Sequence, residues 1–470
     1  MVELPLVLGT ALAVGVGVLA LRALRQRPQR GLLALAALTP FNGLLALVPG
    51  GSSAAYWKEA LLGLTLAATM VAPARALRGA EGAGPAASLP WWPAVAALTL
   101  FGSISAVATA GLVGLYAIKI TFFYLLIPLV LWRAPFTARD RDALVSILML
   151  MGLVTAVVGL WQQLVGGAYL VNLGYSYNDQ VRTAGGILRS FSTFDAPFAF
   201  GLYVMTSLLV GGAVALAEPR RLRNALFLCA TPVLLAGMGV SIVRASYLGL
   251  AVGLLWLAVH RFHKLLAIFA VAAVTAPVVL LLASSTALAP LFSSTSLDQR
   301  GSGWSSILSD VLNHPLGSGL GASGSAAARI AKAAGRSAST TYQPDNYYVK
   351  IALELGPVGL WLFILTLVCV IVSTLRAARF LRERDAALAL GVSASAVAAA
   401  AASLVSTYFE IFPLDVYFWL LLGVVGCSVS QRAGTVTALA VRATGPSASA
   451  SVLSPFDPAG VASRPTPVSS

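Results

Sequence analysis

Long apolar runs, separated by short polar segments, fill most of this chain. The runs are about 17 to 25 residues long, and their apolar residues do not alternate with polar ones. Only helices and closed barrels satisfy their backbone hydrogen bonds in lipid, and barrel strands would alternate. The expected fold is therefore an all-α polytopic membrane protein of about 12–13 transmembrane helices. The candidate spans are residues 5–22, 32–49, 58–74, 91–109, 112–132, 143–166, 195–217, 225–242, 245–260, 265–284, 346–374, 386–405 and 414–430.

Basic residues follow every second one of these spans. Because Lys and Arg are enriched in cytoplasmic loops, these exits are expected in the cytoplasm and the loops between them outside it. Residues 1–430 are then a transmembrane domain, and the Ser-, Pro- and Ala-rich residues 431–470 a disordered cytoplasmic tail. The basic exits contain Arg22, Arg25, Arg27, Arg30, Arg75, Arg78, Arg133, Arg139, Arg141, Arg220, Arg221, Arg223, Arg261, Lys264, Arg376, Arg379, Arg382 and Arg384.

The composition supports a membrane protein and excludes several other classes. Of the 470 residues, 58% are hydrophobic and 10% charged, too apolar for a soluble globule, part of which must face water. The net charge of +14 would indicate a nucleic-acid partner in a soluble protein, but here it follows the loops, so none is expected. The three cysteines lie in apolar runs without metal-ligand spacing, and no metal or cofactor is expected. The N-terminal run has no basic region before it and is interpreted as a span, not as a cleaved signal.

Two outward segments, residues 167–194 and 285–345, are too long for simple connections, and loops of this length usually carry function. Arg189, Arg244 and Arg300 break the charge rule because they lie on the outward side. Guanidinium groups bind phosphate through forked hydrogen bonds, so a cluster of them outside the bilayer suits a lipid-linked pyrophosphate. The alternative is that they anchor loops to anionic lipid headgroups.

Four other polar residues are candidates for function, each with a simpler alternative. Lys119 lies inside a span, which indicates a polar cavity or a partner, unless it snorkels to the interface. His314 is either a turn residue or an acid/base. Asp345 and Asn346 are expected near the N-cap of span 346–374, and for Asp345 capping alone is the alternative.

Lys350 and Glu354 are one helical turn apart and are expected to pair. Together with Asp345 they are expected to lie along the mouth of a cavity. Residues 300–312 are expected to form a short amphipathic helix, which Pro315 and three glycines end with a flexible turn.

These motifs together resemble the O-antigen ligase/polymerase family, which includes Wzy-type polysaccharide polymerases. The family pattern has an Arg, a Trp and then His-Pro-Leu-x-Gly-x-Gly-x-Gly, matched here by Arg300, Trp304 and residues 314–321. A later His or Asp, Asn, nine residues and Gly-x-x-Gly is matched by Asp345, Asn346 and the glycines at 356 and 359. Segments that begin at Arg189 and Arg244 match two further family motifs, so the resemblance covers about residues 180 to 370.

The resemblance implies a GT-C-like glycosyltransferase of the bacterial inner membrane with an extracytoplasmic active site. The donor would be a glycan on undecaprenyl pyrophosphate and the acceptor a sugar hydroxyl. Arg189, Arg244 and Arg300 would neutralise the pyrophosphate, and Asp345, with Glu354 in reserve, would be the base. The glycan would be bound by Trp304, Tyr342, Asn346 and His314.

Several functions remain open at this stage. Ligases of the family usually have His at the position of Asp345, so the sequence favours a polymerase over an O-antigen or surface-glycan ligase. A flippase and a chain-length regulator are expected partners of a polymerase. The rival from another class is a lipid-linked glycan transporter, for which Lys119 alone gives support. A peptidoglycan-type glycosyltransferase and a membrane scaffold explain the motifs less well.

Overall fold

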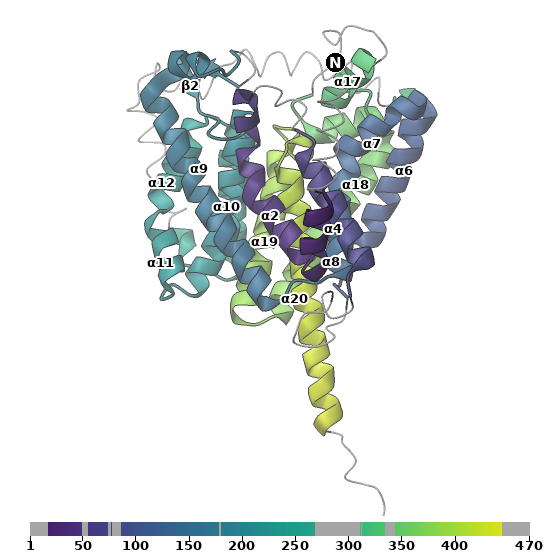
Figure 1. The fold of residues 1–470 in the computed structure, drawn as a ribbon, viewed down its shortest axis with the longest axis vertical. Coiled ribbons are helices and arrows are strands. Elements are labelled where there is room, and N and C mark those ends of the chain that lie inside the picture. The colour runs from purple at the N-terminus through teal and green to yellow at the C-terminus, as the bar shows by residue number, and fades with distance from the viewer. Residues whose placement is uncertain are drawn as a thin grey trace, which may run out of the picture.

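The computed structural model describes residues 17–48, 55–73, 77, 86–177, 180–267, 311, 313–333 and 344–443. Apart from one two-stranded antiparallel sheet, the regular elements in these ranges are helices, which lie side by side in a bundle (Figure 1). The two strands and α17 lie at one end of the bundle, and α20 projects from the other. The expectation of an all-α protein is confirmed.

The elements follow one another along the chain in this order: α2 (Gln29–Leu38), η1 (Thr39–Leu47), α4 (Trp57–Val71), α6 (Trp92–Ala110), η2 (Gly111–Gly114), α7 (Leu115–Phe122), η3 (Phe123–Leu125), α8 (Leu126–Arg133), α9 (Ala138–Asn172), β1 (Arg182–Ala184), β2 (Ile187–Arg189), α10 (Pro197–Ala217), α11 (Leu222–Cys229), α12 (Thr231–Val240), α13 (Arg244–His260), α17 (Gly324–Ala333), α18 (Tyr347–Phe380), α19 (Glu383–Ala402), η5 (Tyr408–Glu410) and α20 (Leu414–Ala443).

Seven helical segments of the described chain are long and apolar enough to cross a bilayer, or eight if the bent pair α11–α12 is one span. One of the seven, Trp92–Arg133, has 42 residues, about twice the length that a single crossing needs. It turns back on itself at η2, since a Cβ on Gly102 would lie 3.0 Å from the ring of Phe122. The spans expected at 91–109 and 112–132 correspond to the parts of this segment before and after the turn. The total of 12–13 spans stays a prediction, because residues 1–16 and 268–310 are outside the described ranges.

The centre of the bundle is formed by α10 and α19, whose side chains are buried along almost their whole length. Small residues let the neighbouring helices approach closely, as is common between helices in membranes. A Cβ on Gly249 of α13 would lie 3.0 Å from the carbonyl oxygen of Ala398, and one on Gly253 would lie 3.2 Å from that of Ala394. Since the two numbers run in opposite directions, α13 and α19 are antiparallel and in close contact.

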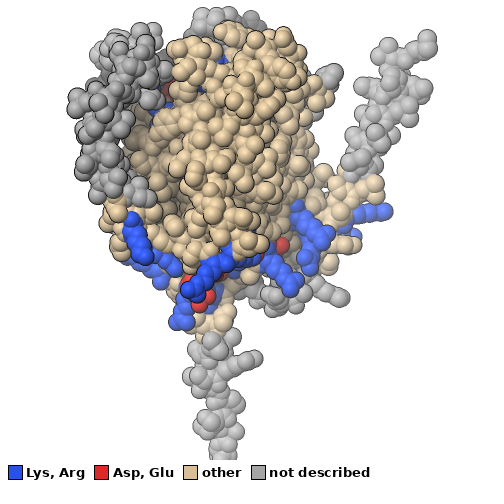
Figure 2. All heavy atoms as spheres, turned by 90° about the vertical axis from the view of Figure 1, so that its left-hand side faces the viewer, with Lys and Arg blue, Asp and Glu red and all other residues tan. Residues whose placement is uncertain are grey.

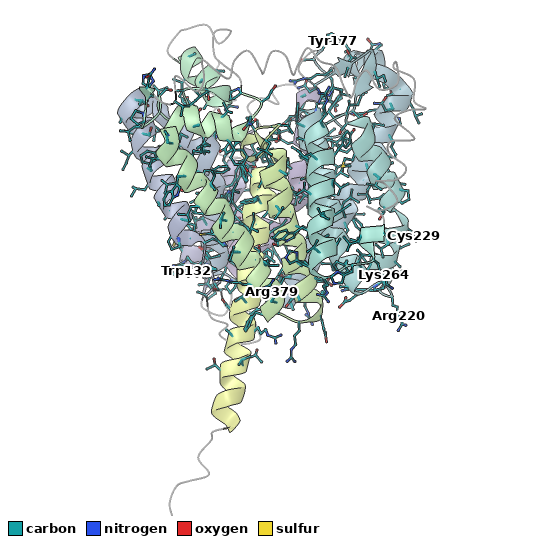
Figure 3. The ribbon with its side chains drawn as sticks, turned by 180° about the vertical axis from the view of Figure 1, so that it is seen from behind. Trp132, Tyr177, Arg220, Cys229, Lys264 and Arg379 are labelled. Atoms are coloured by element: carbon teal, nitrogen blue, oxygen red, sulfur yellow. The ribbon has the colours of Figure 1, made fainter. Side chains whose placement is uncertain are left out.

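The two ends of the bundle differ in charge. Arg220, Lys264 and Arg379 lie at one end, called the basic end below, and Tyr177 lies at the other (Figure 3). The end with Tyr177, β1, β2 and α17 is called the hairpin end. On the face shown in Figure 2, Lys and Arg form a band across the basic end, below a broad area of other residues. This is the distribution that the alternating basic loops predict.

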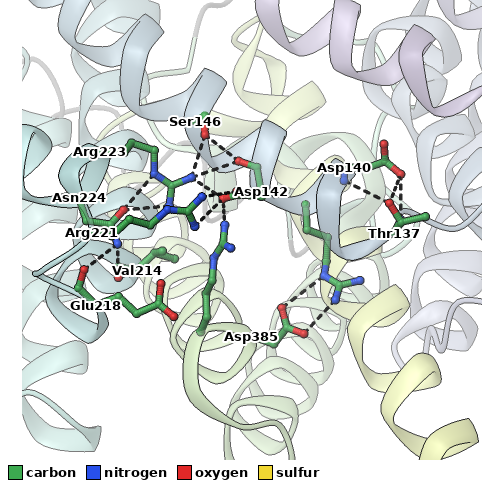
Figure 4. A network of polar contacts seen from close by, with 12 residues as sticks. Thr137, Asp140, Asp142, Ser146, Val214, Glu218, Arg221, Arg223, Asn224 and Asp385 are labelled. Carbon is green, nitrogen blue, oxygen red and sulfur yellow. Dashed lines mark hydrogen bonds and ion pairs between the residues drawn. The ribbon is translucent and has the colours of Figure 1, made fainter. Parts of the chain in front are cut away.

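An ionic network ties three helices together at the basic end. Asp142 of α9 accepts from Arg221 and Arg223 at 2.5 Å each and also contacts Arg384 of α19 (Figure 4). The network brings the starts of α9, α11 and α19 to one level. α20 continues through this end to Ala443. Residues 431–443, expected to belong to a disordered tail, are therefore helical. They contain no Pro and a single glycine, Gly434, so nothing in their sequence stops the helix sharply. Residues 444–470 are not described.

Candidate functional site at the hairpin end

A break in α18 fixes the segment of residues 314–321, called the glycine segment below. Gly356 has non-helical dihedral angles (φ 65°, ψ −171°), and Pro357 has no N–H to donate to Leu353. The carbonyl of Leu353 instead accepts from the N–H and Oγ of Ser318, at 2.9 and 2.8 Å, and that of Glu354 accepts from the N–H of Gly319 at 2.9 Å. The expected flexible turn is thus held by hydrogen bonds along its length, because the broken helix leaves these acceptors open.

Glycine is required in this segment because other backbone and side-chain atoms occupy the Cβ positions. A Cβ on Gly317 would overlap the carbonyl of Glu354, and one on Gly356 would overlap that of Pro315. Gly319 lies against the side chain of Thr109 in α6 in the same way. These glycines also have positive φ, at 75°, 102° and 65° for residues 317, 319 and 356. The two glycine motifs of the sequence therefore pack against each other.

Directly behind the glycine segment lies a buried cluster of one lysine and two glutamates. Lys350 Nζ is 2.5 Å from Glu354 Oε1 and 2.9 Å from Glu410 Oε1, and the three side chains are at most 5% exposed. Glu354 Oε1 also accepts from the N–H and Oγ of Ser323, at 3.0 and 2.8 Å. A Cβ on Gly324 would lie 3.0 Å from Lys350 Cε. The cluster therefore joins α18, η5 and the start of α17, and it confirms the expected pairing of Lys350 with Glu354.

A second group of charges lies around the hairpin. Arg189 is opposite Arg182 in the register of β1 and β2, an arrangement of like charges that is unfavourable without an anion. Arg189 is half-buried, with its guanidinium 5.0 Å from the ring of Phe198. Burial, followed by the positive charges of Arg182 and Arg244, lowers the pKa of Arg189 from its ordinary value. The Nε of Arg189 lies 3.5 Å from the carbonyl oxygen of Ser241, three residues before Arg244, so Arg189 is close to the start of α13.

The chain after Arg189 is held rigidly. Gln162 of α9, which is 1% exposed, accepts from the N–H of Ser192 at 2.7 Å and donates to its carbonyl at 2.8 Å. Ser192 has a positive φ of 55°, which is rare for a residue with a side chain. The segment ends at Asp195, whose carboxylate accepts from Asn42 at 2.6 Å. Arg189 is therefore fixed by buried hydrogen bonds on its C-terminal side.

The starts of α13 and α18 are both near the end of α19. Arg244 begins α13 five residues before Gly249, and Ser403 follows α19 five residues after Ala398, the contact partner of Gly249. Because the two helices are antiparallel, Arg244 and Ser403 lie at the same level. The carbonyl of Ser403 in turn accepts from the N–H of Tyr347, the first residue of α18, at 2.9 Å. Arg244 and the N-terminus of α18, which follows Asp345, are thus both near the end of α19.

A third polar group surrounds Lys119. Its Nζ is 2.8 Å from Oε1 of Glu59, in the first turn of α4. The neighbouring Lys58 lies with its Nζ 3.7 Å from the ring centroid of Phe412. The expectation that Lys119 has a partner is confirmed.

The sequence-predicted site residues fall into three classes. Arg189, Arg244 and the Lys350–Glu354 pair are brought to the hairpin end. Asn346 is the N-cap of α18 and accepts from the N–H groups of Tyr348 and Val349 at 2.9 and 3.2 Å, and Asp345 beside it is exposed. His314 is also exposed, at the start of the glycine segment. Arg300, Trp304 and Tyr342 lie outside the described residues.

Two parts of the site were not found from the sequence. Glu410 lies between the last two expected spans, 386–405 and 414–430, without any motif around it, and only the rarity of an acid at the end of a span could have drawn attention to it. Gln162 lies in an apolar run, where a buried amide signals a hydrogen-bonded partner. Within the described ranges, no group of three or more His, Cys, Asp or Glu is arranged to hold a metal ion.

The fold and these clusters define a polytopic membrane protein with an arginine-bearing polar site at one end of its bundle. Residues 229–364 match the family model of O-antigen ligase, which confirms the resemblance over that stretch. The matched residues include Arg244, the glycine segment and the broken helix at Gly356. The match implies a membrane-bound transferase of the glycan ligase or polymerase type with lipid-linked glycan substrates. A comparison with curated proteins finds no match.

Proposed function

We propose that this protein is a polysaccharide polymerase that transfers a glycan from undecaprenyl pyrophosphate to a sugar hydroxyl of the acceptor. The observation that carries the proposal is the contact of Arg189 with Ser241, three residues before Arg244, which brings two cations 55 residues apart in the sequence together at the end of the bundle opposite the basic band. By the positive-inside rule, the hairpin end faces away from the cytoplasm. The proposed membrane is the bacterial inner membrane, where such donors are available on the outer face.

The arginines would act on the leaving group. When the acceptor oxygen attacks the anomeric carbon, the bond from that carbon to the pyrophosphate oxygen breaks, and negative charge develops on undecaprenyl pyrophosphate. Cations fixed in place stabilise such charge without reorganisation during the reaction. The buried hydrogen bonds of Gln162 and the stacking on Phe198 hold Arg189 in this way. Arg300 is the third proposed pyrophosphate ligand.

Asp345 is the proposed base that takes the proton of the acceptor hydroxyl. It is exposed at the N-terminus of α18, whereas Glu354 has no exposed side-chain surface and is already paired with Lys350. We therefore assign to Glu354 a positioning role, in which it holds Ser323 and the glycine segment behind the site. His314, Asn346, Trp304 and Tyr342 are the proposed glycan contacts, and a flippase and a chain-length regulator the proposed partners.

A strain that lacks this gene tests the proposal. Complementation with the unaltered protein should restore full-length polymer, and Arg244→Ala or Asp345→Ala should leave single repeat units. Arg220→Ala, which changes an exposed arginine at the basic end, is the control. Full-length polymer with Arg244→Ala and Asp345→Ala, at normal protein level, would contradict the proposal.

The second candidate is a surface-glycan ligase, which the description of the matching family favours. A ligase would transfer a finished glycan to a different acceptor and leave polymer length unchanged. Loss of surface attachment with normal polymer length on the lipid carrier would identify it.

A further inference from the structure

A groove runs along the membrane-facing side of the bundle between α18 and α20, far from the glycan site. It encloses about 370 Å³ and is lined mostly by apolar side chains of both helices, and by Ser88, Pro90 and Trp91 before α6. On α18 its lining extends from Val368 to Phe380. At 1.5 Å per residue, that length is about 18 Å, close to half the thickness of the hydrocarbon core of a bilayer. The groove therefore fits an acyl chain of one leaflet.

The end of the groove near the basic end carries two arginines. Arg376 lines the groove, is exposed, and makes no hydrogen bond or ion pair with any of the described residues. Arg432 of α20 lies with its guanidinium 5.3 Å from the ring of Phe380, another lining residue. The Nε of Arg432 is buried and has no hydrogen-bond partner among the described residues. A buried guanidinium N–H without an acceptor is costly, so an acceptor beyond the described residues is indicated at this position.

We infer that this groove binds an anionic phospholipid of the leaflet at the basic end. One acyl chain would lie between α18 and α20, and the phosphate would accept hydrogen bonds from Arg376 and Arg432. The lining contains no carboxylate that could pair with these two side chains, whereas a phospholipid phosphate supplies several charged acceptors at the depth where the groove ends. The inference does not depend on the proposed glycan transfer.

The glycan donor is a poorer occupant of this groove. Its pyrophosphate is proposed to lie near Arg189 and Arg244, at the opposite end of the bundle, whereas Arg376 is one helical turn before Arg379, which lies at the basic end (Figure 3). An isoprenoid chain that entered the groove from the hairpin end would leave Arg376 and Arg432 without an acceptor. The charge at the basic end thus favours a lipid of that leaflet.

Native mass spectrometry of the full-length protein tests this inference. The protein, released from nanodiscs of phosphatidylcholine with added phosphatidylglycerol, should retain one phosphatidylglycerol. The double variant Arg376→Gln/Arg432→Gln should bind it roughly 25-fold more weakly, since each basic residue near an anionic headgroup contributes roughly fivefold. Arg379→Gln, which removes an exposed arginine of α18 that does not line the groove, should bind it normally.

A second pair of variants tests the apolar part of the groove. Val372→Trp should fill the groove and displace the phospholipid, and Ile364→Trp, at an exposed position of α18 outside the lining, should not. The inference is overturned if the unaltered protein retains phosphatidylcholine as readily as phosphatidylglycerol, or if the double arginine variant retains phosphatidylglycerol as the unaltered protein does. Retention of undecaprenyl phosphate that is insensitive to the arginine variants would also overturn it.

Discussion

Lys350 and Glu354 form a fully buried ion pair, with Nζ and Oε1 2.5 Å apart, directly behind the glycine segment. Glu410 completes the cluster at 2.9 Å from the same ammonium. Charges are taken out of water here only because each has partners, and the removal of one partner leaves the others uncompensated. The cluster therefore makes the position of the glycine segment dependent on α18 and η5.

Replacement of the lysine should destabilise the protein strongly. Lys350→Met leaves two buried carboxylates without a cation, and we expect a loss of about 3–5 kcal/mol in stability. The thermal unfolding midpoint of the purified protein in detergent measures it. Lys350→Met/Glu354→Gln should recover part of the loss, and an unchanged midpoint for Lys350→Met would show that the pair does not contribute.

Gly356 and Gly166 form a matched pair for a test of the glycine packing. Both have similar strained dihedral angles, φ 65° and ψ −171° at Gly356 and φ 77° and ψ 168° at Gly166, but a Cβ on Gly166 would meet no atom within 4 Å. Each substitution by Ala should cost about 1–3 kcal/mol in backbone strain. Gly356→Ala should also displace the glycine segment and abolish glycan transfer, whereas Gly166→Ala should retain transfer. Equal activity of the two variants would contradict this packing role.

The arginine pair should be required for the chemical step. Arg189→Gln and Arg244→Gln should each lower kcat about 10²–10³-fold, the usual effect of removing one preorganised donor from a developing negative charge. Arg189→Lys should recover little, because an ammonium cannot reproduce the fork of a guanidinium. The measurement is the rate of glycan transfer by protein of unchanged thermal stability. An effect on KM alone would indicate substrate binding without a role in the reaction.

Asp345 and Glu354 should respond differently to neutral substitution. Asp345→Asn should keep normal stability and lose about 10²–10⁴-fold in rate, as expected for a general base. Glu354→Gln should lower stability, because the buried cluster loses a charge. Its effect on the rate should be smaller than that of Asp345→Asn, because Glu354 acts only through the position of the glycine segment. If Glu354→Gln loses the rate at normal stability and Asp345→Asn does not, the two roles are reversed.

Positions 177 and 220 should be accessible to reagents from opposite sides of the membrane. In intact cells, a membrane-impermeant thiol reagent should label Tyr177→Cys, at the hairpin end, and should leave Arg220→Cys unlabelled until the cells are opened (Figure 3). A background free of the native thiols Cys229, Cys369 and Cys427 is needed. Labelling of Arg220→Cys in intact cells would reverse the proposed orientation.

Much of the fold follows from the sequence because lipid imposes simple rules. The spans expected at 195–217 and 245–260 correspond to α10 at 197–217 and α13 at 244–260, since a continuous apolar run can be satisfied only as a helix. The bend between α11 and α12 and the continuation of α20 beyond residue 430 were not expected. The bend coincides with Pro232 in the first turn of α12, and the extension of α20 projects from the bundle, so neither follows from the length of an apolar run.

The site was less accessible from the sequence than the fold. Arg189 and Arg244 stood out because outward arginines break a rule, and the pairing of Lys350 with Glu354 follows from their spacing of four. Spacing could not show that Glu354 is buried or that Glu410, 56 residues later, shares the same lysine. The contact between the two glycine motifs required the dihedral angles of Gly356 and the missing N–H of Pro357, which together direct the acceptors of α18 toward the glycine segment.

Glycan transfer by the purified protein tests the central claim most directly. Proteoliposomes with the full-length protein and undecaprenyl-pyrophosphate-linked repeat units should produce a ladder of longer lipid-linked glycans and release undecaprenyl pyrophosphate without nucleotide. Arg244→Gln should leave the repeat units unextended at normal protein folding. Movement of the lipid-linked units across the membrane without any extension would contradict the account and indicate a transporter.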